Sequence, residues 1–580
     1  MNVCDMVKSD SEVFHFETKY DDRPVSEQTV NEVLQSRAEQ LGDDPLVFYG
    51  PEDRAVSYAQ MNEVANAVGN SLADSGVEKG DKVSVMMQDP LRTLQAFLGI
   101  VRAGAMYCPI NFEYKGDVLA YQLDDTDPDI LIIEDQYIDR LNDVGDGLST
   151  DPHVVVRETG ADAPGVDGFD TGTFGQLLEG DSTTAPPVDL SWRDEAAIIY
   201  TSGTTGKPKG CVCSHRYWMA GICLVFGQIL EEDDVVHNSL PMYHIAGVGQ
   251  VLIPMVAGAA CSLWQQFSPT EFWDRVDRYE STHTILLSVM IPWLVKPPEQ
   301  PDDDENTIKM TIMQPVPDNW QAIANRFGFE VVPMMYSQTE ASVPLSGFVH
   351  AEGGKPDDWI KGVHPDDIVE KVEGLNMPML DEIPGDRFMG RPISSVAEGK
   401  IVDTETGEEL PPGNVGELVL RPKQEHVFME EYYGMPDKTA ETFRDGWLHT
   451  GDAAYRDEDG NYFFVDRLGD VIRRRGENIS SLQIQDAVNS HAEVEQAAVF
   501  PVPAPEGGED QIGCAVQLAE DSTLDRAGLE AYLSDRLPEF MIPDRVTFFD
   551  VLPTTETGKI EKYKLREQFA DTDTPRAEDD

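Results

Sequence analysis

The stretch YTSGTTGKPKG, residues 200–210, combines three glycines, four serine or threonine hydroxyls and two lysines. Apolar segments flank it on both sides, AAIIY at 196–200 and CVCSH at 211–215. Both flanks have the short apolar or alternating pattern that is typical of β-strands. The stretch is therefore predicted to be a loop that joins two strands.

This loop differs from a Walker-type phosphate loop, in which a Gly-Lys pair is followed by Ser or Thr and then by a helix. Here Pro208 follows Lys207, and Thr201 stands where the Walker pattern has its first glycine. The N–H and O–H donors of the loop could still wrap a polyphosphate from outside a sheet. An ordinary turn is the alternative for such a loop taken alone.

The charge composition narrows the classes of partner. The 580 residues include 44 basic and 106 acidic side chains, which gives a formal net charge of −62, and the acidic excess is spread along the chain. So negative a surface repels phosphate backbones and anionic lipids, which argues against nucleic acid and membrane partners. Self-repulsion also lowers stability at low salt. The composition favours a protein of a salt-loving organism over an ordinary acidic enzyme.

Cysteine usage and the N-terminus favour a cytoplasmic protein. The seven cysteines are expected to be reduced, and the first twenty residues lack the basic-then-apolar order of a signal peptide. Residues 245–267 carry no charge, but glutamines, glycines and Pro254 interrupt them. We therefore expect a buried helix and strand there, with no membrane span. The oligomeric state stays open, and a homo-oligomer is one alternative.

Helical and strand patterns alternate along the chain. Residues 57–76 have apolar side chains at helical spacing and end at a glycine. Residues 81–87 have the pattern of a strand that follows this helix. Repeated units of this kind predict an α/β fold with largely parallel sheets. Residues 141–187, 297–306 and 351–366 are expected to be irregular surface segments, and the last dozen residues to be disordered.

Several segments resemble, in the right order, the motifs of the adenylate-forming superfamily. That superfamily includes acyl-CoA synthetases, firefly luciferase and the adenylation domains of peptide synthetases. Residues 200–210 are similar to its signature loop. The further segments are PMYHIAG at 241–247, YSQTE at 336–340, GWLHTGD at 446–452, DRLGDVIRRRGENIS at 466–480 and PTTETGKIEK at 553–562. The resemblance covers nearly the whole chain.

The resemblance implies a two-domain architecture. Residues 1–466 would form a large N-terminal domain of layered α/β sheets with a β-barrel-like subdomain. Residues 467–469 would form a hinge. Residues 470–580 would form a small, mobile α+β domain that carries the catalytic lysine.

The resemblance also assigns roles in ATP binding. Glu340 matches a magnesium ligand, which suits a hard carboxylate, while Thr339 would contact phosphate and Tyr336 would stack on adenine. Asp452 would accept hydrogen bonds from both ribose hydroxyls, and Arg467 matches a second ribose or phosphate contact. The phosphate-cradling residues would be Thr201, Ser202, Gly203, Thr204, Thr205, Gly206 and Lys207. Outside these ordered motifs, a lone Glu, Asp or Lys would be a solvated surface residue.

The resemblance also assigns residues to the two chemical steps, acyl-adenylate formation and thioester formation. Lys559 matches the lysine that bridges the substrate carboxylate and the α-phosphate. The loop at 473–480, with Arg475, Gly476 and Glu477, would serve thioester formation with CoA. His244 could gate the acyl pocket or be an ordinary hydrogen-bonded histidine.

A C-x-C-x-H spacing also invites a metal interpretation. Cys211, Cys213 and His215 provide three candidate ligands, but a closed tetrahedral site needs a fourth. The metal site is therefore the weaker alternative to a buried strand.

Three departures from the family pattern concern the hinge and the substrate. Gly469 stands where relatives usually have Lys or Asp, MQPVP at 313–317 replaces a glycine- and alanine-rich turn, and Ser337 replaces a glycine. The sequence RRRGENISS at 473–481 is similar to that of the crotonobetaine or carnitine-CoA ligase branch. We expect a carboxylic acid–CoA ligase that uses ATP and Mg²⁺ and forms an acyl-adenylate. The alternatives are an adenylation enzyme that loads a carrier protein, a luciferase-type monooxygenase and a non-catalytic nucleotide-binding protein.

Overall fold

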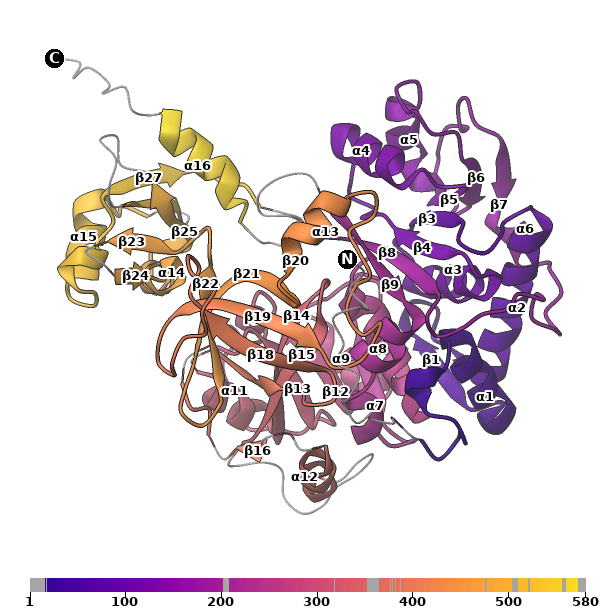
Figure 1. Cartoon of the computed structure of the whole chain (residues 1–580), viewed down its shortest axis with the longest axis horizontal. Helices are drawn as coiled ribbons and strands as arrows, with labels where there is room; N and C mark the ends of the chain where they lie inside the picture. The colour runs from indigo at the N-terminus through magenta and orange to yellow at the C-terminus, as the bar shows by residue number, and fades with distance from the viewer. Residues whose placement is uncertain are drawn as a thin grey trace. The chain divides into compact units, whose positions relative to one another are not determined.

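The computed structural model divides the chain into two compact units, which are drawn in Figure 1. Unit 1 comprises Met1–Ser202, Lys207–Gly399 and Leu420–Leu448, and unit 2 comprises Gly203–Gly206, Lys400–Val419 and His449–Asp580. The structure describes residues 16, 18–201, 208–317, 319–351, 365–375, 377, 379–380, 382–385, 387–474, 477–502, 510–519, 522–554 and 560–571. Within these ranges, no helix combines the length and apolar character needed to cross a bilayer. The units reflect compactness alone, so the domain boundaries at 466–470 stay a prediction.

The first sheet of unit 1 has seven strands in the order β7-β6-β5-β3-β4-β8-β9. All neighbours are parallel except β8 and β9. From β3 the chain passes to β4 on one side and then returns to β5 on the other, which makes β3 and β5 the switch point of the sheet. The strands are β3 (Lys82–Met86), β4 (Met106–Pro109), β5 (Ile130–Glu134), β6 (His153–Arg157), β7 (Thr171–Thr173), β8 (Glu195–Thr201) and β9 (Lys209–Ser214).

Capped helices accompany this sheet. A Ser57–Gln60 capping box starts α2 (Tyr58–Asp74), and the Asp89 carboxylate caps α3 (Pro90–Ala103). A Cβ added to Gly99 would lie 2.3 Å from Val68 Cγ1, so only glycine allows α3 to approach α2 this closely. The other helices are α1 (Val30–Leu41), α4 (Gly116–Thr126), α5 (Ile138–Gly145) and α6 (Phe174–Leu177).

The second sheet of unit 1 follows the order β17-β15-β14-β13-β12-β10-β11-β1-β2, and β16 pairs with β15. The run β14-β13-β12-β10-β11-β1 is parallel throughout, and β2 is antiparallel to β1. Strand β15 is antiparallel to β14 and β17 but parallel to β16. The strands are β1 (Pro45–Tyr49), β2 (Arg54–Ser57), β10 (Val235–Asn238), β11 (Ala260–Leu263), β12 (His283–Leu287), β13 (Met310–Gln314), β14 (Val331–Gln338), β15 (Ser342–His350), β16 (Met379–Leu380) and β17 (Phe388–Pro392).

The uncharged segment that begins at Ile245 forms a buried helix and then a buried strand, which confirms that expectation. Helix α8 (Ile245–Ala257) ends at Gly258, whose φ of 83° favours glycine, and β11 follows it. The remaining elements of unit 1 are α7 (Phe226–Ile229), α9 (Phe272–Arg278), α10 (Ile291–Val295), α11 (Trp320–Phe327), α12 (Pro365–Gly374), α13 (Pro436–Thr442) and β20 (Phe443–Arg444).

Unit 2 contains the run β18-β19-β21-β22, whose first three strands begin or end in the segments of unit 1. It also contains a hairpin, β23-β24, and a sheet, β25-β26-β27, with a separate apolar core on each face. The strands are β18 (Ala397–Val402), β19 (Gly416–Pro422), β21 (Trp447–Arg456), β22 (Tyr462–Arg467), β23 (Ile472–Arg474), β24 (Glu477–Ile479), β25 (Val494–Val502), β26 (Gln511–Leu518) and β27 (Arg545–Phe549). The helices are α14 (Ser481–Asn489), α15 (Arg526–Ser534) and α16 (Lys562–Asp571).

The mixed α/β fold class is confirmed, but the prediction of irregular structure for 141–187 is wrong. That region includes β6, whose valines are paired in parallel with β5, and the short elements β7 and α6. Three consecutive valines inside an Asp- and Gly-rich stretch extend the sheet because β5 offers them a buried neighbour. Residues 297–306 do form exposed turns, while 352–364 and 572–580 lie outside the described residues.

Candidate active site

The predicted loop joins two antiparallel strands, as the sequence indicated. Thr201 at the end of β8 pairs with Lys209 at the start of β9, and Tyr200 pairs with Gly210. A Cβ on Gly210 would lie 2.6 Å from Ile198 Cγ2, so this position needs glycine. The six loop residues proposed to cradle phosphate, Ser202, Gly203, Thr204, Thr205, Gly206 and Lys207, lie outside the described residues.

Thr339 and Glu340 form the turn between β14 and β15, and Tyr336 is buried near the end of β14. Backbone contacts hold this turn: Tyr217 Oη donates to the Thr339 carbonyl at 3.0 Å, and the Met429 N–H donates to the Glu340 carbonyl at 3.0 Å. These hydrogen bonds fix the backbone of the turn. The half-buried side chains of Thr339 and Glu340 therefore project from a rigid turn.

Tyr432 connects this turn to the loop hairpin. Its hydroxyl donates to Glu340 Oε1 at 2.6 Å, and Lys209 Nζ lies 4.1 Å from the centroid of its ring. The segment around Tyr432 pairs with β9, since the Glu430 N–H donates to the Val212 carbonyl at 2.8 Å. Burial and the nearby Glu340 charge raise the pKa of Tyr432, so the phenol stays a hydrogen-bond donor. One tyrosine thus joins the base of the loop to the proposed magnesium ligand.

Sequence reasoning did not identify Tyr432 or Tyr217. Tyr432 contacts a carboxylate 92 residues away in the chain, and the local EEYYG sequence has no feature that marks it. The contact follows from strand pairing at β9, which single-sequence patterns do not report.

The alternative metal site at the C-x-C-x-H spacing is not supported. Burial, and next the Glu340 charge, raises the pKa of the Cys211 thiol; burial and nearby charges including Glu340 raise that of Cys213. His215 Nδ1 accepts the Val30 N–H at 3.3 Å, and burial lowers its pKa to about 4. Among the described residues, no group of three or more His, Cys, Asp or Glu could hold a metal ion.

Glu340 fits the chemistry of a magnesium ligand. It offers a hard carboxylate, half-buried and oriented by Tyr432. Mg²⁺ is commonly held by one or two carboxylates, with substrate phosphates and water as the other ligands. A single protein carboxylate beside the predicted phosphate loop would therefore be a sufficient protein contribution.

The carboxyl edge of the second sheet carries two of the three departures from the family pattern, at 313–317 and at Ser337. Gln314 ends β13 and its amide donates to the Met335 carbonyl on β14 at 3.0 Å. His244 precedes α8, and its ring lies 4.5 Å from that of Tyr243. Gln314 and Tyr336 thus stand at the ends of adjacent strands, where open α/β sheets present ligands.

In unit 2, Asp452 and Arg467 are partners. They face each other across β21 and β22, and Arg467 Nη1 lies 2.8 Å from Asp452 Oδ1. The Asp452 side chain is 1% exposed, whereas that of Arg467 is 47% exposed. The sequence predicted two separate nucleotide contacts; the structure places the two side chains in one ion pair.

Three other predicted residues, Arg475, Gly476 and Lys559, lie outside the described residues. Of Glu477, the structure describes only its backbone position at the start of β24. Their roles stay predictions.

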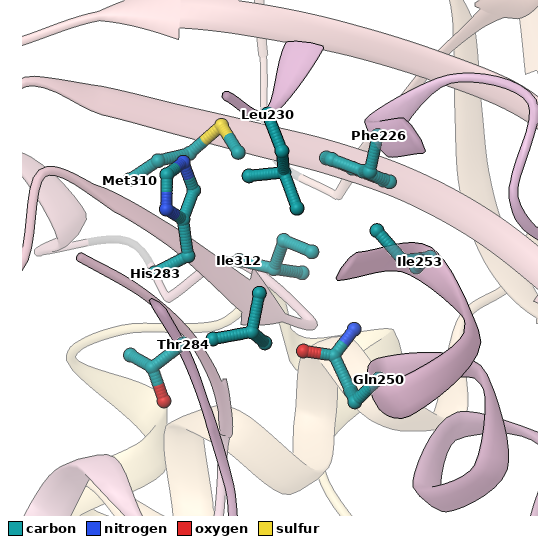
Figure 2. A pocket seen from close by; sticks show the side chains of 9 residues that line it. Phe226, Leu230, Gln250, Ile253, His283, Thr284, Met310 and Ile312 are labelled. Carbon is teal, nitrogen blue, oxygen red and sulfur yellow. The ribbon is translucent and has the colours of Figure 1, made fainter. Parts of the chain in front are cut away.

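A small cavity of about 20 Å³ lies elsewhere in unit 1 (Figure 2). It is at the amino ends of β10, β12 and β13, opposite the edge that carries Tyr336 and Gln314. Its size suits about one water molecule. It is lined by Phe226, Leu230, Val236, Gln250, Ile253, His283, Thr284, Met310 and Ile312.

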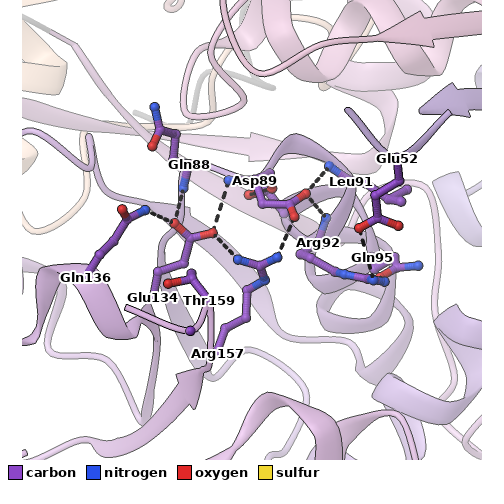
Figure 3. Close-up of polar contacts among 12 residues, drawn as sticks. Glu52, Gln88, Asp89, Leu91, Arg92, Gln95, Glu134, Gln136, Arg157 and Thr159 are labelled. Carbon is purple, nitrogen blue, oxygen red and sulfur yellow. Dashed lines mark hydrogen bonds and ion pairs between the residues drawn. The ribbon is translucent and has the colours of Figure 1, made fainter. Parts of the chain in front are cut away.

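The switch point of the first sheet is filled by the chain's own charges (Figure 3). Arg157 Nη2 lies 2.6 Å from Asp89 Oδ2, and Arg157 Nη1 lies 2.9 Å from Glu134 Oε1. Glu134 Oε2 also accepts the Gln136 amide at 2.7 Å. This arrangement stabilises the carboxyl edge of the first sheet.

Comparison with protein families matches residues 34–433 to AMP-binding enzymes and residues 483–559 to the C-terminal domain of AMP-binding enzymes. The chain belongs to the AMP-binding enzymes. A similar AMP-binding enzyme is named crotonobetaine/carnitine–CoA ligase, from Salmonella paratyphi A. It is 28% identical over 555 residues, which cover 93% of this chain and 99% of that protein.

Solved structures agree with this membership at the level of the fold. ATP-bound MatB from Rhodopseudomonas palustris has a TM-score of 0.73 and 24% identity, covering 94% of this chain and 99% of its own. The o-succinylbenzoate CoA synthetase from Bacillus subtilis, in complex with its acyl-adenylate intermediate, has a TM-score of 0.73 and 21% identity. That comparison covers 93% of this AMP-binding enzyme and 98% of the synthetase.

Proposed function

We propose that this AMP-binding enzyme is an ATP-dependent carboxylic acid–CoA ligase. It converts an acid, ATP and CoA to acyl-CoA, AMP and pyrophosphate through an acyl-adenylate. The observation that carries this proposal is the link from Lys209, which follows the proposed phosphate loop, through Tyr432 to Glu340. The crotonobetaine/carnitine–CoA ligase name of a relative that matches almost end to end supports CoA as the acceptor.

The adenylation step brings two anions together. A substrate carboxylate attacks the α-phosphorus of ATP, and negative charge builds on the α-phosphate and the leaving pyrophosphate. Fixed donors and cations supply most of the catalysis in such a step. The N–H and O–H groups of 201–207 would bind the phosphates, with Thr339 as a further donor. Glu340 would hold Mg²⁺, which neutralises phosphate charge when it is bound.

The Asp452–Arg467 pair would bind the ribose. A buried carboxylate is an acceptor that two ribose hydroxyls can share. The half-exposed guanidinium of Arg467 pairs with that carboxylate, and it would turn toward a phosphate when the ribose arrives. Nucleotide binding thus replaces one partner of Asp452 with another.

Thioester formation would use a second domain orientation. Lys559 would serve the first step, and Arg475, Gly476 and Glu477 would serve the second, with Gly469 as the hinge. A Cβ on Gly469 would meet no atom within 4 Å, and its φ lies outside the left-handed region. This conformation therefore does not require glycine. This is consistent with a second domain orientation in which the backbone at Gly469 adopts a conformation that only glycine allows.

The proposal is tested with a panel of carboxylic acids. The protein is incubated in high salt with ATP, Mg²⁺ and each acid, and AMP is measured with and without CoA. The expected result is CoA-dependent AMP release for at least one acid. AMP release that ignores CoA but needs a phosphopantetheinyl carrier would favour carrier loading. The absence of AMP with every acid and acceptor would favour a non-catalytic nucleotide-binding protein.

The role of Lys559 is tested by separating the two steps. Lys559→Ala is expected to abolish acyl-adenylate formation while thioester formation from supplied acyl-adenylate stays within a few-fold of the parent enzyme. An equal loss in both steps would contradict the assigned role.

A further inference from the structure

An ionic cluster surrounds Asp470, the first residue after the proposed hinge. Arg566 forms an ion pair with its carboxylate, and Lys562 Nζ lies 3.9 Å from Asp470 Oδ2. The Asp470 side chain is only 11% exposed, and Lys562 is 14% exposed. A carboxylate so enclosed needs its cations, because removing them leaves a charge with little water around it.

Both cations come from helix α16. Lys562 and Arg566 are four residues apart, so their side chains lie on the same face of the helix. Another face of α16 contributes Leu565 and Phe569 to the apolar core on the β25-β26-β27 sheet. The helix is therefore held on one face by the sheet and on another by Asp470.

The first turn of α16 is also joined to α14. Lys562 Nζ donates to Ser481 Oγ at 3.0 Å, and the Ser481 N–H donates to Asp466 Oδ2 at 2.6 Å. Asp466 and Asp470 lie on the two sides of the hinge residues, and both connect to this one contact region.

The segment that contains Lys559 is attached at both ends to the base of α16. The Glu561 N–H donates to the Pro553 carbonyl at 2.8 Å, and Thr554 forms an antiparallel bridge with Ile560. The described residues on the two sides of 555–559 are therefore joined to each other, and the second side continues directly into Lys562. Any shift of the first turn of α16 moves these ends.

We propose that Asp470 is a positioning residue for the adenylation step. Through Lys562 and Arg566 it fixes the base of α16, and thereby the place of Lys559, relative to the hinge. When the backbone at 467–469 turns, Asp470 carries the lysine segment with it as one body. This inference rests on the proposed function.

The residues proposed for the second step have a different anchor. Arg474 Nη1 and Nη2 bind the two oxygens of Asp544 at 2.6 and 3.0 Å, next to the β23-β24 hairpin. Loss of the Asp470 cluster leaves that anchor in place. The two half-reactions should therefore respond differently to changes at Asp470.

The first test measures both half-reactions. Asp470→Asn is expected to slow acid-dependent pyrophosphate–ATP exchange at least tenfold, and to slow thioester formation from supplied acyl-adenylate less than twofold. Arg566→Gln should show the same split, and Asp470→Glu should recover exchange to within threefold of the parent. Glu530→Gln, which breaks the exposed Arg526–Glu530 pair in the same unit, is the matched control and should change neither step. An equal fall in both half-reactions, or no fall, would overturn the inference.

The second test does not depend on activity. Amide hydrogen exchange of residues 562–571 should become at least tenfold faster in Asp470→Asn, while β25 and β26 keep their protection. Unchanged exchange in α16 would overturn the inference even if activity falls. Inactivity of the unmodified protein with every acid would instead count against the proposed function, and the exchange measurement would still decide the role of Asp470.

Discussion

At the scale of single residues, the hydrogen bond from Tyr432 to Glu340 leads to a kinetic prediction. The bond is 2.6 Å long and its acceptor is a carboxylate, a class that contributes about 1.5–3 kcal/mol. Tyr432→Phe should therefore lower kcat/KM for adenylation roughly 10- to 100-fold, since about 1.4 kcal/mol corresponds to a factor of ten. It should also raise the Mg²⁺ concentration at half-maximal rate. Pyrophosphate–ATP exchange at varied Mg²⁺ measures both effects.

Tyr433→Phe is the matched control for that experiment. Its hydroxyl accepts from Lys82 Nζ at 3.2 Å and does not contact Glu340. Tyr433→Phe also removes one hydroxyl oxygen, but this hydroxyl does not contact Glu340, so the Mg²⁺ dependence should stay unchanged. If both variants shift the Mg²⁺ dependence equally, the hydroxyl of Tyr432 does not orient the metal ligand.

These contacts also separate what the sequence could predict at the site from what it could not. Glu340 and Asp452 stand inside short motifs, so a single sequence was enough to select them. Tyr432 and the Asp452–Arg467 pair depend on strand register between segments that are distant in the chain. Strand register is a property of the assembled sheet, and the spacing of residues within one segment does not predict it.

At the scale of elements, Arg157 holds together the carboxyl ends of β5 and β6 and the start of α3. It binds Asp89 and Glu134, whose side chains are 4% and 1% exposed, and Asp89 also caps α3. Arg157→Met should lower the free energy of unfolding by about 3 kcal/mol, because two buried carboxylates lose their cation. Urea unfolding at neutral pH measures the loss.

The Arg157 prediction has an internal check. Adding Glu134→Gln to Arg157→Met removes one of the uncompensated charges and should recover at least 1 kcal/mol of the loss. Arg526→Met, at an exposed pair on α15, should cost less than about 1 kcal/mol. A cost for Arg157→Met as small as that of Arg526→Met would mean that water reaches Asp89 and Glu134.

The elements themselves were predictable where the hydrophobic period is long. The helix expected over 57–76 is α2, and the apolar runs at 81–87 and 196–200 are strands. The region 141–187 was not predictable in this way, because β6 is a five-residue strand among polar residues. Its identity as a strand comes from the neighbour that it pairs with, β5.

At the scale of the whole molecule, the charge of −62 and the buried imidazoles act on stability in different ways. Surface carboxylates repel one another, and this repulsion is screened within about 3 Å at 1 M salt. Buried groups are screened much less. Measurements in molar salt therefore isolate the contribution of the interior.

Three buried histidines set the expected pH dependence. Burial lowers the pKa of His215 and His283 to about 4 and that of His237 to about 3. In the unfolded chain a histidine titrates near 6.5, so below that pH the unfolded state binds protons that the folded state does not. Their contribution is complete above pH 6.5 and is lost as the pH falls toward 4. At pH 5 each imidazole costs about 2 kcal/mol, or roughly 6 kcal/mol together, at 1.36 kcal/mol per pKa unit.

Urea unfolding in 2 M KCl between pH 7.5 and 5 checks this expectation, with a slope near pH 5 that corresponds to uptake of about three protons on unfolding. His237→Asn should reduce that uptake by about one proton, since its ring lies buried against Phe272 with no carboxylate among the causes of its shift. A stability that is flat from pH 7.5 to 5 would mean that the folded protein takes up these protons as readily as the unfolded chain.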